Sequence, residues 1–107
     1  MLRIYGVILE VVEALGPVIE GIGRHDPDLA RQMRRALSSV ALNTAEGSYS
    51  RGRNRGARYS DAMGSMRETL ACIEVAMAHR YVDDVDTRVL DSIDRVIATL
   101  FNNARRP

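Results

Sequence analysis

The stretch Ala57–Ala78, which reads ARYSDAMGSMRETLACIEVAMA, decides the fold class of this chain. Its larger apolar residues recur at alternating steps of four and three, which is the spacing of one face of an amphipathic α-helix. They are Tyr59, Met63, Met66, Leu70, Ile73 and Met77. A second line holds only small residues, namely Ala57, Gly64, Ala71 and Ala78. The pattern predicts a helix that ends between His79 and Val82, and the small residues would let another helix approach closely.

A second helix is predicted on the N-terminal side of this stretch. It opens at Asp26-Pro27, because an Asp side chain accepts hydrogen bonds from first-turn amides and a proline at the first helical position loses none. The same 4-3 spacing then continues through Leu29, Met33, Ala36, Val40, Asn43 and Gly47. The next segment, Ser48–Gly56, is polar and rich in Gly and Arg. It is predicted to be a loop.

Two further helices flank this pair. The first, Leu2–Ile22, is predicted from a stripe of Ile4, Ile8, Val11, Leu15, Val18 and Ile22. Within it, Gly16-Pro17 predicts a kink or short break near Leu15, since proline removes a backbone hydrogen bond, and Gly23 is expected to cap its end. The last helix, Val85–Asn103, carries Val89, Ile93, Val96 and Leu100 inward. It follows three acids that would stabilise its positive end: Asp83, Asp84 and Asp86.

Four amphipathic helices without an alternating strand pattern predict an all-α protein. The expected fold is an antiparallel up-down-up-down four-helix bundle, formed by a single domain over residues 1–107. The first and last helices carry apolar arcs wider than one bundle core needs. Burying that surplus surface would favour self-association, so a homo-oligomer is expected.

Several function classes lack their sequence signals. Glu10, Glu13 and Glu20 interrupt the apolar N-terminal run, which favours a soluble helix over a membrane segment. The single cysteine, Cys72, is typical of a buried thiol in the reducing cytoplasm. Neither His25 nor His79 belongs to a metal-binding pattern, and we expect each to interact with carbonyls at a helix end. No nucleophile or phosphate-loop motif is present, so we predict a non-enzyme without metal or cofactor.

The charges point instead to a binding surface. All fifteen basic residues are Arg, and the middle third of the chain holds eight of them against two acids. Those eight are Arg31, Arg34, Arg35, Arg51, Arg53, Arg55, Arg58 and Arg67. Guanidinium groups and a basic loop attract a phosphate backbone, and Tyr49 and Tyr59 could stack on unpaired bases. The same arginines could instead cover a solvated face or pair with acids on a neighbouring copy.

Three segments of the middle region carry a family resemblance: Gln32–Ala36, Ser39–Gly47 and Ala62–Glu68. They closely resemble the four-helix-bundle family of 23S rRNA intervening-sequence proteins. That family includes relatives of the accessory variability determinant of diversity-generating retroelements. The resemblance covers about half the chain. It implies a four-helix bundle, a ring-shaped homopentamer and no enzymatic activity. For the retroelement relatives it also implies binding to nucleic acid and to a reverse transcriptase.

The motif at the centre of this resemblance also has a structural interpretation. Asn43 and Glu46 lie on the predicted core face, where a buried amide and carboxylate must be hydrogen-bonded. Their candidate partners on the next helix are Ser65, Arg67 and Glu68. Gly47 and Gly64 would permit the close backbone approach. We therefore interpret the motif as a tether between two helices rather than a binding site.

Two functional hypotheses remain open at this point. In the first, a homo-oligomeric adaptor binds RNA or DNA through its Arg-rich middle and assists a nucleic-acid enzyme such as a reverse transcriptase. In the second, the protein is a protein-only scaffold whose arginines pair with acids of other subunits, around Asp83–Asp94, or with an acidic partner protein.

Overall fold

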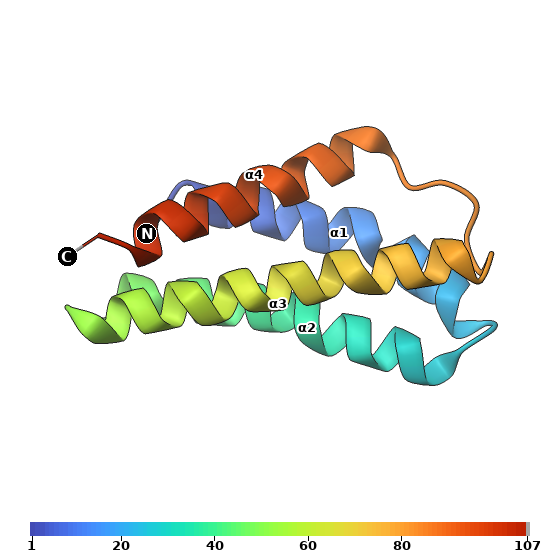
Figure 1. Cartoon of the computed structure of the whole chain (residues 1–107), viewed down its shortest axis with the longest axis horizontal. Helices are drawn as coiled ribbons and strands as arrows, with labels where there is room; N and C mark the ends of the chain where they lie inside the picture. The colour runs from blue at the N-terminus through green and yellow to red at the C-terminus, as the bar shows by residue number, and fades with distance from the viewer. Residues whose placement is uncertain (107) are drawn as a thin grey trace.

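A computed structural model describes residues 1–106 as four α-helices joined by short turns (Figure 1). The helices are α1 (Ile4–Gly23), α2 (Pro27–Ser48), α3 (Arg53–Ala78) and α4 (Thr87–Ala104). Consecutive helices run in opposite directions, and each packs against two neighbours, so that α1 also meets α4. The bundle measures 43 × 25 × 19 Å. The predicted all-α four-helix bundle is confirmed, with no strand among the described residues.

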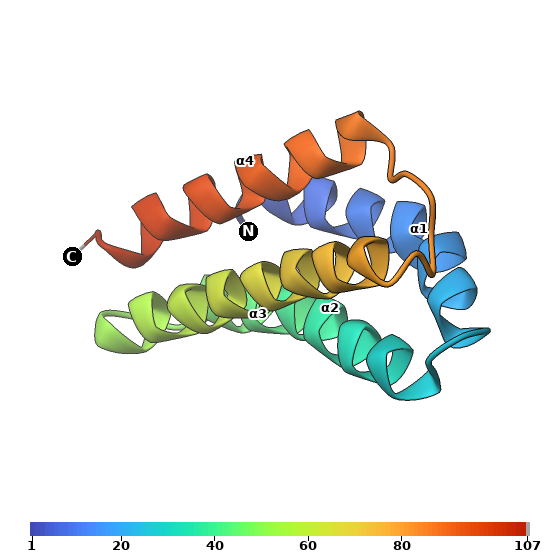
Figure 2. The same cartoon turned by 45° about the vertical axis from the view of Figure 1, so that its right-hand side comes forward.

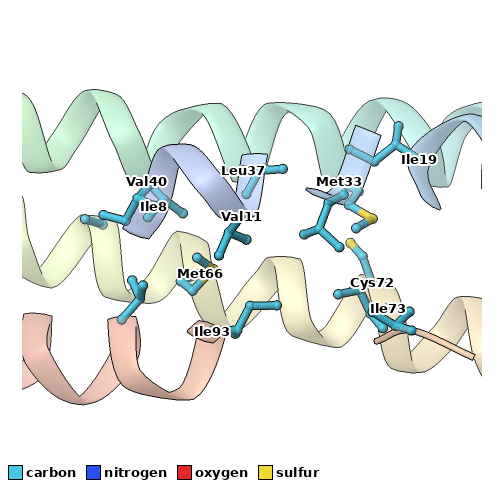
Figure 3. Packing of buried hydrophobic residues seen from close by; sticks show 14 of the residues in the cluster. Ile8, Val11, Ile19, Met33, Leu37, Val40, Met66, Cys72, Ile73 and Ile93 are labelled. Atoms are coloured by element: carbon cyan, nitrogen blue, oxygen red, sulfur yellow. The ribbon is translucent and has the colours of Figure 1, made fainter. Parts of the chain in front are cut away.

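The core is aliphatic and sulfur-rich, as expected for a chain without Trp. Figure 3 shows Ile8 and Val11 of α1 facing Val40 and Leu37 of α2, with Met66 of α3 below them. The predicted inward stripes of α1 and α4 are buried, except for Val18 and Val89, which are half-buried. Burial of these side chains stabilises the fold by roughly 25 cal/mol per Å² of apolar surface.

The buried face of α3 differs from the predicted one. Met63, Leu70 and Met77 are only half-buried, and small side chains are buried in their place. These are Ala62, Thr69, Cys72 and Ala76. The physical reason is close packing. Ser65 of α3 bonds to Ser39 of α2, and Ala62 and Thr69 share its side of the helix at helical spacing. Gly56 of α3 lies against Ala104 of α4. Met63, Leu70 and Met77 follow Gly56 at seven-residue steps toward that seam. The line Ala57, Gly64, Ala71 and Ala78 is exposed, so no helix of the same chain approaches it.

The predicted loop Ser48–Gly56 is present but shorter than predicted. Helix α2 continues to Ser48 and α3 begins at Arg53, so the connection contains only Tyr49–Gly52. Gly52 has φ = 58°, which only glycine adopts easily, and that single turn residue is enough to reverse the chain. Gly56 lies inside α3, where a Cβ would be 2.9 Å from the carbonyl oxygen of Ala104. The absence of a side chain there lets the end of α4 pack on α3.

Helix α1 continues through Pro17, so of the two alternatives predicted near Leu15, a kink or a short break, the break is absent. Pro17 lies on the exposed side of the helix, where the ring faces solvent. Gly23 is still helical and Arg24 occupies the C-cap position, which corrects the predicted cap. Helix α4 begins at Thr87, slightly later than predicted, because Asp86 is its N-cap and accepts from the backbone N–H of Arg88 at 2.9 Å. That hydrogen bond lowers the pKa of Asp86.

The end of the bundle formed by the α1–α2 and α3–α4 turns holds both histidines. Tyr81 lies between them, stacked on His25 at 5.3 Å and on His79 at 4.9 Å between ring centroids. The histidines do lie at helix ends, but their rings stack on Tyr81 instead of bonding terminal carbonyls. Arg80 adopts φ = 62° to bring Tyr81 back over α3. Five aspartates lie in or beside these two turns: Asp26, Asp28, Asp83, Asp84 and Asp86.

Candidate nucleic-acid interface

The opposite end of the bundle is basic. The α2–α3 turn, the N-terminus and the C-terminal end of α4 all lie toward this end (Figures 1 and 2). Seven exposed arginines come together there, and we call this surface the basic end. They are Arg3, Arg51, Arg53, Arg55, Arg58, Arg105 and Arg106. Three of them, Arg3, Arg105 and Arg106, were not predicted, because they are distant in sequence and only folding brings them to the others.

Contacts between the three segments hold the basic end together. The Ser48 hydroxyl donates to Met1 Sδ at 3.3 Å, which joins the N-terminus to the end of α2. Arg55 Nε donates to the Ser50 carbonyl at 3.1 Å, across the α2–α3 turn. An open cavity of about 450 Å³ lies between the start of α3 and the end of α4, with Arg53 and Arg106 in its lining. Arg53, Arg55 and Arg58 are therefore carried by α3 itself, whereas the other four arginines of the basic end lie just outside the helix ends.

Most of this positive charge is uncompensated. Arg58 Nη1 donates to Asn43 Oδ1 at 3.3 Å, and its Nη2 lies 4.0 Å from Glu46 Oε2. For the other six arginines, no side-chain carboxylate within residues 1–106 forms an ion pair at 4.0 Å or less. Arg58 thus holds α2 to α3, whereas the remaining six have no carboxylate partner among the described residues. Of these six, Arg105 lies over the ring of Phe101 at 5.1 Å.

The two tyrosines near the turn have different roles. Tyr49 is 85% exposed and lies two residues before Arg51, so its ring is accessible to a base. Tyr59 is only 4% exposed and belongs to the core, as its place in the predicted apolar stripe indicates, which excludes the alternative of stacking on a base. One aromatic side chain therefore accompanies the basic end.

The remaining predicted arginines lie elsewhere. Arg31 forms an ion pair with Asp28 of its own helix turn. Arg34 and Arg35 are exposed on the outer face of α2, and Arg67 is exposed on α3. The eight arginines predicted as one surface are thus divided between the basic end, the outer face of α2 and α3.

The predicted tether between α2 and α3 exists, and of its three candidate partners Ser65 takes part, through the hydroxyl of Ser39. Asn43 is only half-buried and Glu46 is exposed, which corrects their predicted burial. Ser65 Oγ donates to Ser39 Oγ at 3.0 Å, and Asn43 Nδ2 donates to the same hydroxyl at 2.9 Å. Within residues 1–106, neither Arg67 nor Glu68 forms a side-chain hydrogen bond or an ion pair with α2.

Two glycines of the motif also behave differently. A Cβ at Gly47 would lie 2.5 Å from Cε1 of Tyr59, so this glycine does permit close packing of the α3 side chain. A Cβ at Gly64 would meet nothing within 4 Å, so its predicted role in helix approach is wrong. The buried polar residue in this part of α2 is Thr44, one position after Asn43, whose hydroxyl donates to the Val40 carbonyl at 2.7 Å. Sequence spacing alone did not single it out.

Three further observations concern metal binding, thiol reactivity and membrane spans. Residues 1–106 contain no group of three or more His, Cys, Asp and Glu side chains that could hold a metal ion. Burial raises the pKa of the Cys72 thiol, and the nearby Glu68 carboxylate raises it further, which disfavours the reactive thiolate. Across the same residues, none of the helices has the length and apolarity of a bilayer span.

Comparison with known proteins adds one finding. The model of a family described as 23S rRNA-intervening sequence protein matches residues 10–102, which include most of α1 and all of α2 and α3. No curated protein matches the chain.

Proposed function

The chain belongs to the 23S rRNA-intervening sequence protein family, and from that premise we propose that it is a non-catalytic, homo-oligomeric adaptor that binds RNA or DNA. The basic end is the binding surface. A role beside a reverse transcriptase or another nucleic-acid enzyme is part of the same proposal. The observation that carries it is the convergence of seven arginines from three chain segments on one end of the bundle.

The proposed binding is electrostatic. Each guanidinium that neutralises a phosphate releases condensed counterions, so affinity falls as salt rises. Six arginines without a carboxylate partner predict a slope of log K against log salt of about −4 to −5. Because phosphate contacts carry no sequence information, the basic end alone would bind many sequences. Tyr49 would add a preference for unpaired bases.

Self-association would strengthen such binding without adding any new kind of contact between one copy and the nucleic acid. Copies held in one assembly present several basic ends to one strand, and the second contact becomes intramolecular. Half-buried apolar residues along the α3–α4 seam, such as Met63 and Leu70, and the exposed Phe101 support self-association. The pentamer implied by the resemblance is one assembly of this kind.

The test compares two triple variants with equal loss of charge. Arg51, Arg53 and Arg55 are changed together to Ala in one variant. Arg67, Arg88 and Arg95, which lie outside the basic end, are changed to Ala in the other. Fluorescence anisotropy with labelled single- and double-stranded RNA and DNA of 20 nucleotides would measure affinity at several salt concentrations.

We expect the first variant to lose most binding and its salt slope to become shallower by about 2 to 3. The second variant should retain binding at moderate salt. Equal losses in the two variants would show that only net charge matters and would refute a localised surface. Absent or salt-insensitive binding by the unmodified protein would refute the nucleic-acid function itself.

A protein-only scaffold is the second candidate. It is supported by Arg34 and Arg35, which are exposed on α2, away from the basic end, and have no carboxylate partner among the described residues. Affinity purification after nuclease treatment would distinguish the two functions. Recovery of one protein partner, together with no binding to RNA or DNA, would favour the scaffold.

A further inference from the structure

The outer face of α2 combines free positive charge with an exposed leucine. Leu42 is 67% exposed, and Arg34 and Arg35 lie about two turns before it on the same open side of the helix. A shallow cavity of about 510 Å³ lies beside Leu42, with Arg34, Arg35 and Glu46 in its lining. We call this surface the α2 face. The carboxylate of Glu46 would repel a phosphate backbone, so a protein partner suits this surface better than a nucleic acid.

The outer face of α1 has the complementary pattern. Leu9 is 40% exposed, and Glu13 and Glu20 are exposed on the same side of the helix. Neither glutamate forms an ion pair within residues 1–106. We call this surface the α1 face. The two faces are thus complementary in charge. In the described part of the chain, the α1 face has an exposed leucine beside two unpaired acids, and the α2 face has an exposed leucine beside two unpaired arginines.

The heights of these residues along the bundle also match. Met1 meets Ser48 at one end of the α1–α2 pair, and Gly23 lies against Ala30 at the other. By interpolation, Leu9 lies at the height of Leu42. Along the bundle axis, Glu13 lies on one side of the Arg34–Arg35 pair and Glu20 on the other, and each glutamate is about one helical turn or less from the pair.

Rotation about an axis parallel to the helices leaves every residue at its own height. A second copy related by such an axis would therefore bring its α1 against α2 of the first in the same antiparallel register that the two helices have within one chain. Leucine then meets leucine, and each arginine meets a carboxylate. No sliding of one copy along the other is needed.

We propose that the α1 face of one copy docks on the α2 face of the next, with Glu13 and Glu20 pairing with Arg34 and Arg35 around a Leu9–Leu42 contact. This inference rests on the homo-oligomeric part of the proposed function. The contact joins two different surfaces, so it is heterologous, and with an axis parallel to the helices it forms a ring when the rotation between copies closes. Apolar contact supplies the attraction, and the charge pairs select partner and register. All basic ends then lie on one side of the ring.

Charge reversal and its rescue test the contact on the full chain. One variant carries Glu13→Arg and Glu20→Arg, another carries Arg34→Glu and Arg35→Glu, and a third carries all four changes. Asp91→Arg with Asp94→Arg is the control, because it makes the same charge change on the exposed side of α4. Mass is measured by light scattering after gel filtration, and helix content by circular dichroism.

At a concentration where the unmodified protein is oligomeric, each double reversal should lower the mass to that of the 11.9 kDa chain. The fourfold variant should recover the oligomer, and the control should remain oligomeric. If the reversals leave the oligomer intact, or the fourfold variant stays monomeric and folded, the contact is refuted while self-association stands. A monomeric unmodified protein would refute both. If the Arg34/Arg35 reversal abolishes nucleic-acid binding without changing the mass, those arginines belong to the nucleic-acid surface and the contact is again refuted.

Discussion

Replacing Gly47 by Ala should destabilise the protein, although alanine is the better helix former. A Cβ at position 47 would lie 2.5 and 2.7 Å from two ring atoms of Tyr59 and 3.3 Å from Cβ of Arg58. Carbon atoms pack favourably at about 3.5 to 4.0 Å, so the ring must move by roughly 1 Å. Tyr59 is buried, so moving its ring displaces other core side chains. Overpacking costs about 1 to 3 kcal/mol, against a helix-propensity gain of about 1 kcal/mol.

Gly64→Ala is the matched control, because it adds the same methyl group to a helix interior where nothing lies within 4 Å. It should stabilise the protein by about 0.5 to 1 kcal/mol. The two variants should thus differ by about 1 to 3 kcal/mol. Urea denaturation followed by circular dichroism, at one fixed protein concentration, measures the difference. The reasoning is refuted if Gly47→Ala is as stable as Gly64→Ala. It is supported further if Tyr59→Leu restores the stability of the Gly47→Ala variant.

Three more predictions follow from single contacts. Cys72 should react with iodoacetamide at neutral pH at least about tenfold more slowly in the folded than in the urea-unfolded chain, because burial raises its thiol pKa; equal rates would contradict this. Asp26→Ala should cost about 1 kcal/mol in urea denaturation, since the Leu29 N–H loses its acceptor at 3.0 Å, whereas Asp26→Asn should cost less. Gly56→Ala should accelerate amide exchange at the end of α4, because the new methyl group would meet the Ala104 carbonyl at 2.9 Å; unchanged exchange there would contradict the close approach.

The sequence predicted the helices where burial itself creates the pattern. Ile4, Ile8 and Val11 recur at helical spacing because they are the residues that face the core. The start of α3 was missed for the opposite reason: Arg53–Gly56 has the composition of a loop, but only Gly52 has a backbone conformation that stops a helix. The amino-acid composition of a segment indicates how far it is exposed to solvent. An exposed first turn of a helix therefore has the same polar composition as a loop.

Which flank of a helix is buried was harder to predict. Asn43 falls on the 4-3 stripe of α2, yet the next residue, Thr44, is buried instead. On α3, Ala62 is buried and Met63 is not fully buried. Adjacent positions differ by about 100° around a helix, so a small rotation against a neighbouring helix decides between them. That rotation depends on the partner helix and is not encoded in one helix alone.

The candidate surface was predicted only in its local part. Arg51, Arg53 and Arg55 are neighbours in sequence, so a charge count finds them. Arg3 and Arg106 lie at opposite ends of the chain, and their approach to the turn follows from the up-down-up-down topology. Once four antiparallel helices are expected, both chain termini must lie at the same end as the second turn. The predicted topology therefore also places Arg3 and Arg106 beside the second turn.

The seven arginines of the basic end and the five aspartates of the opposite turns make the protein an electric dipole along its 43 Å axis. Part of the negative charge at the aspartate-rich end is offset there by Arg24, Arg31, Arg80 and Arg88. At physiological salt, charges are screened over about 8 Å, so a polyanion touching the arginines does not sense the aspartates. At 0.01 M salt the screening distance is about 30 Å, and repulsion from the far end begins to oppose binding. The gain in affinity for a polyanion on lowering the salt concentration should therefore level off. At the same low salt, the field of the polyanion exerts a torque on the dipole, which turns the protein so that its basic end faces the polyanion before contact.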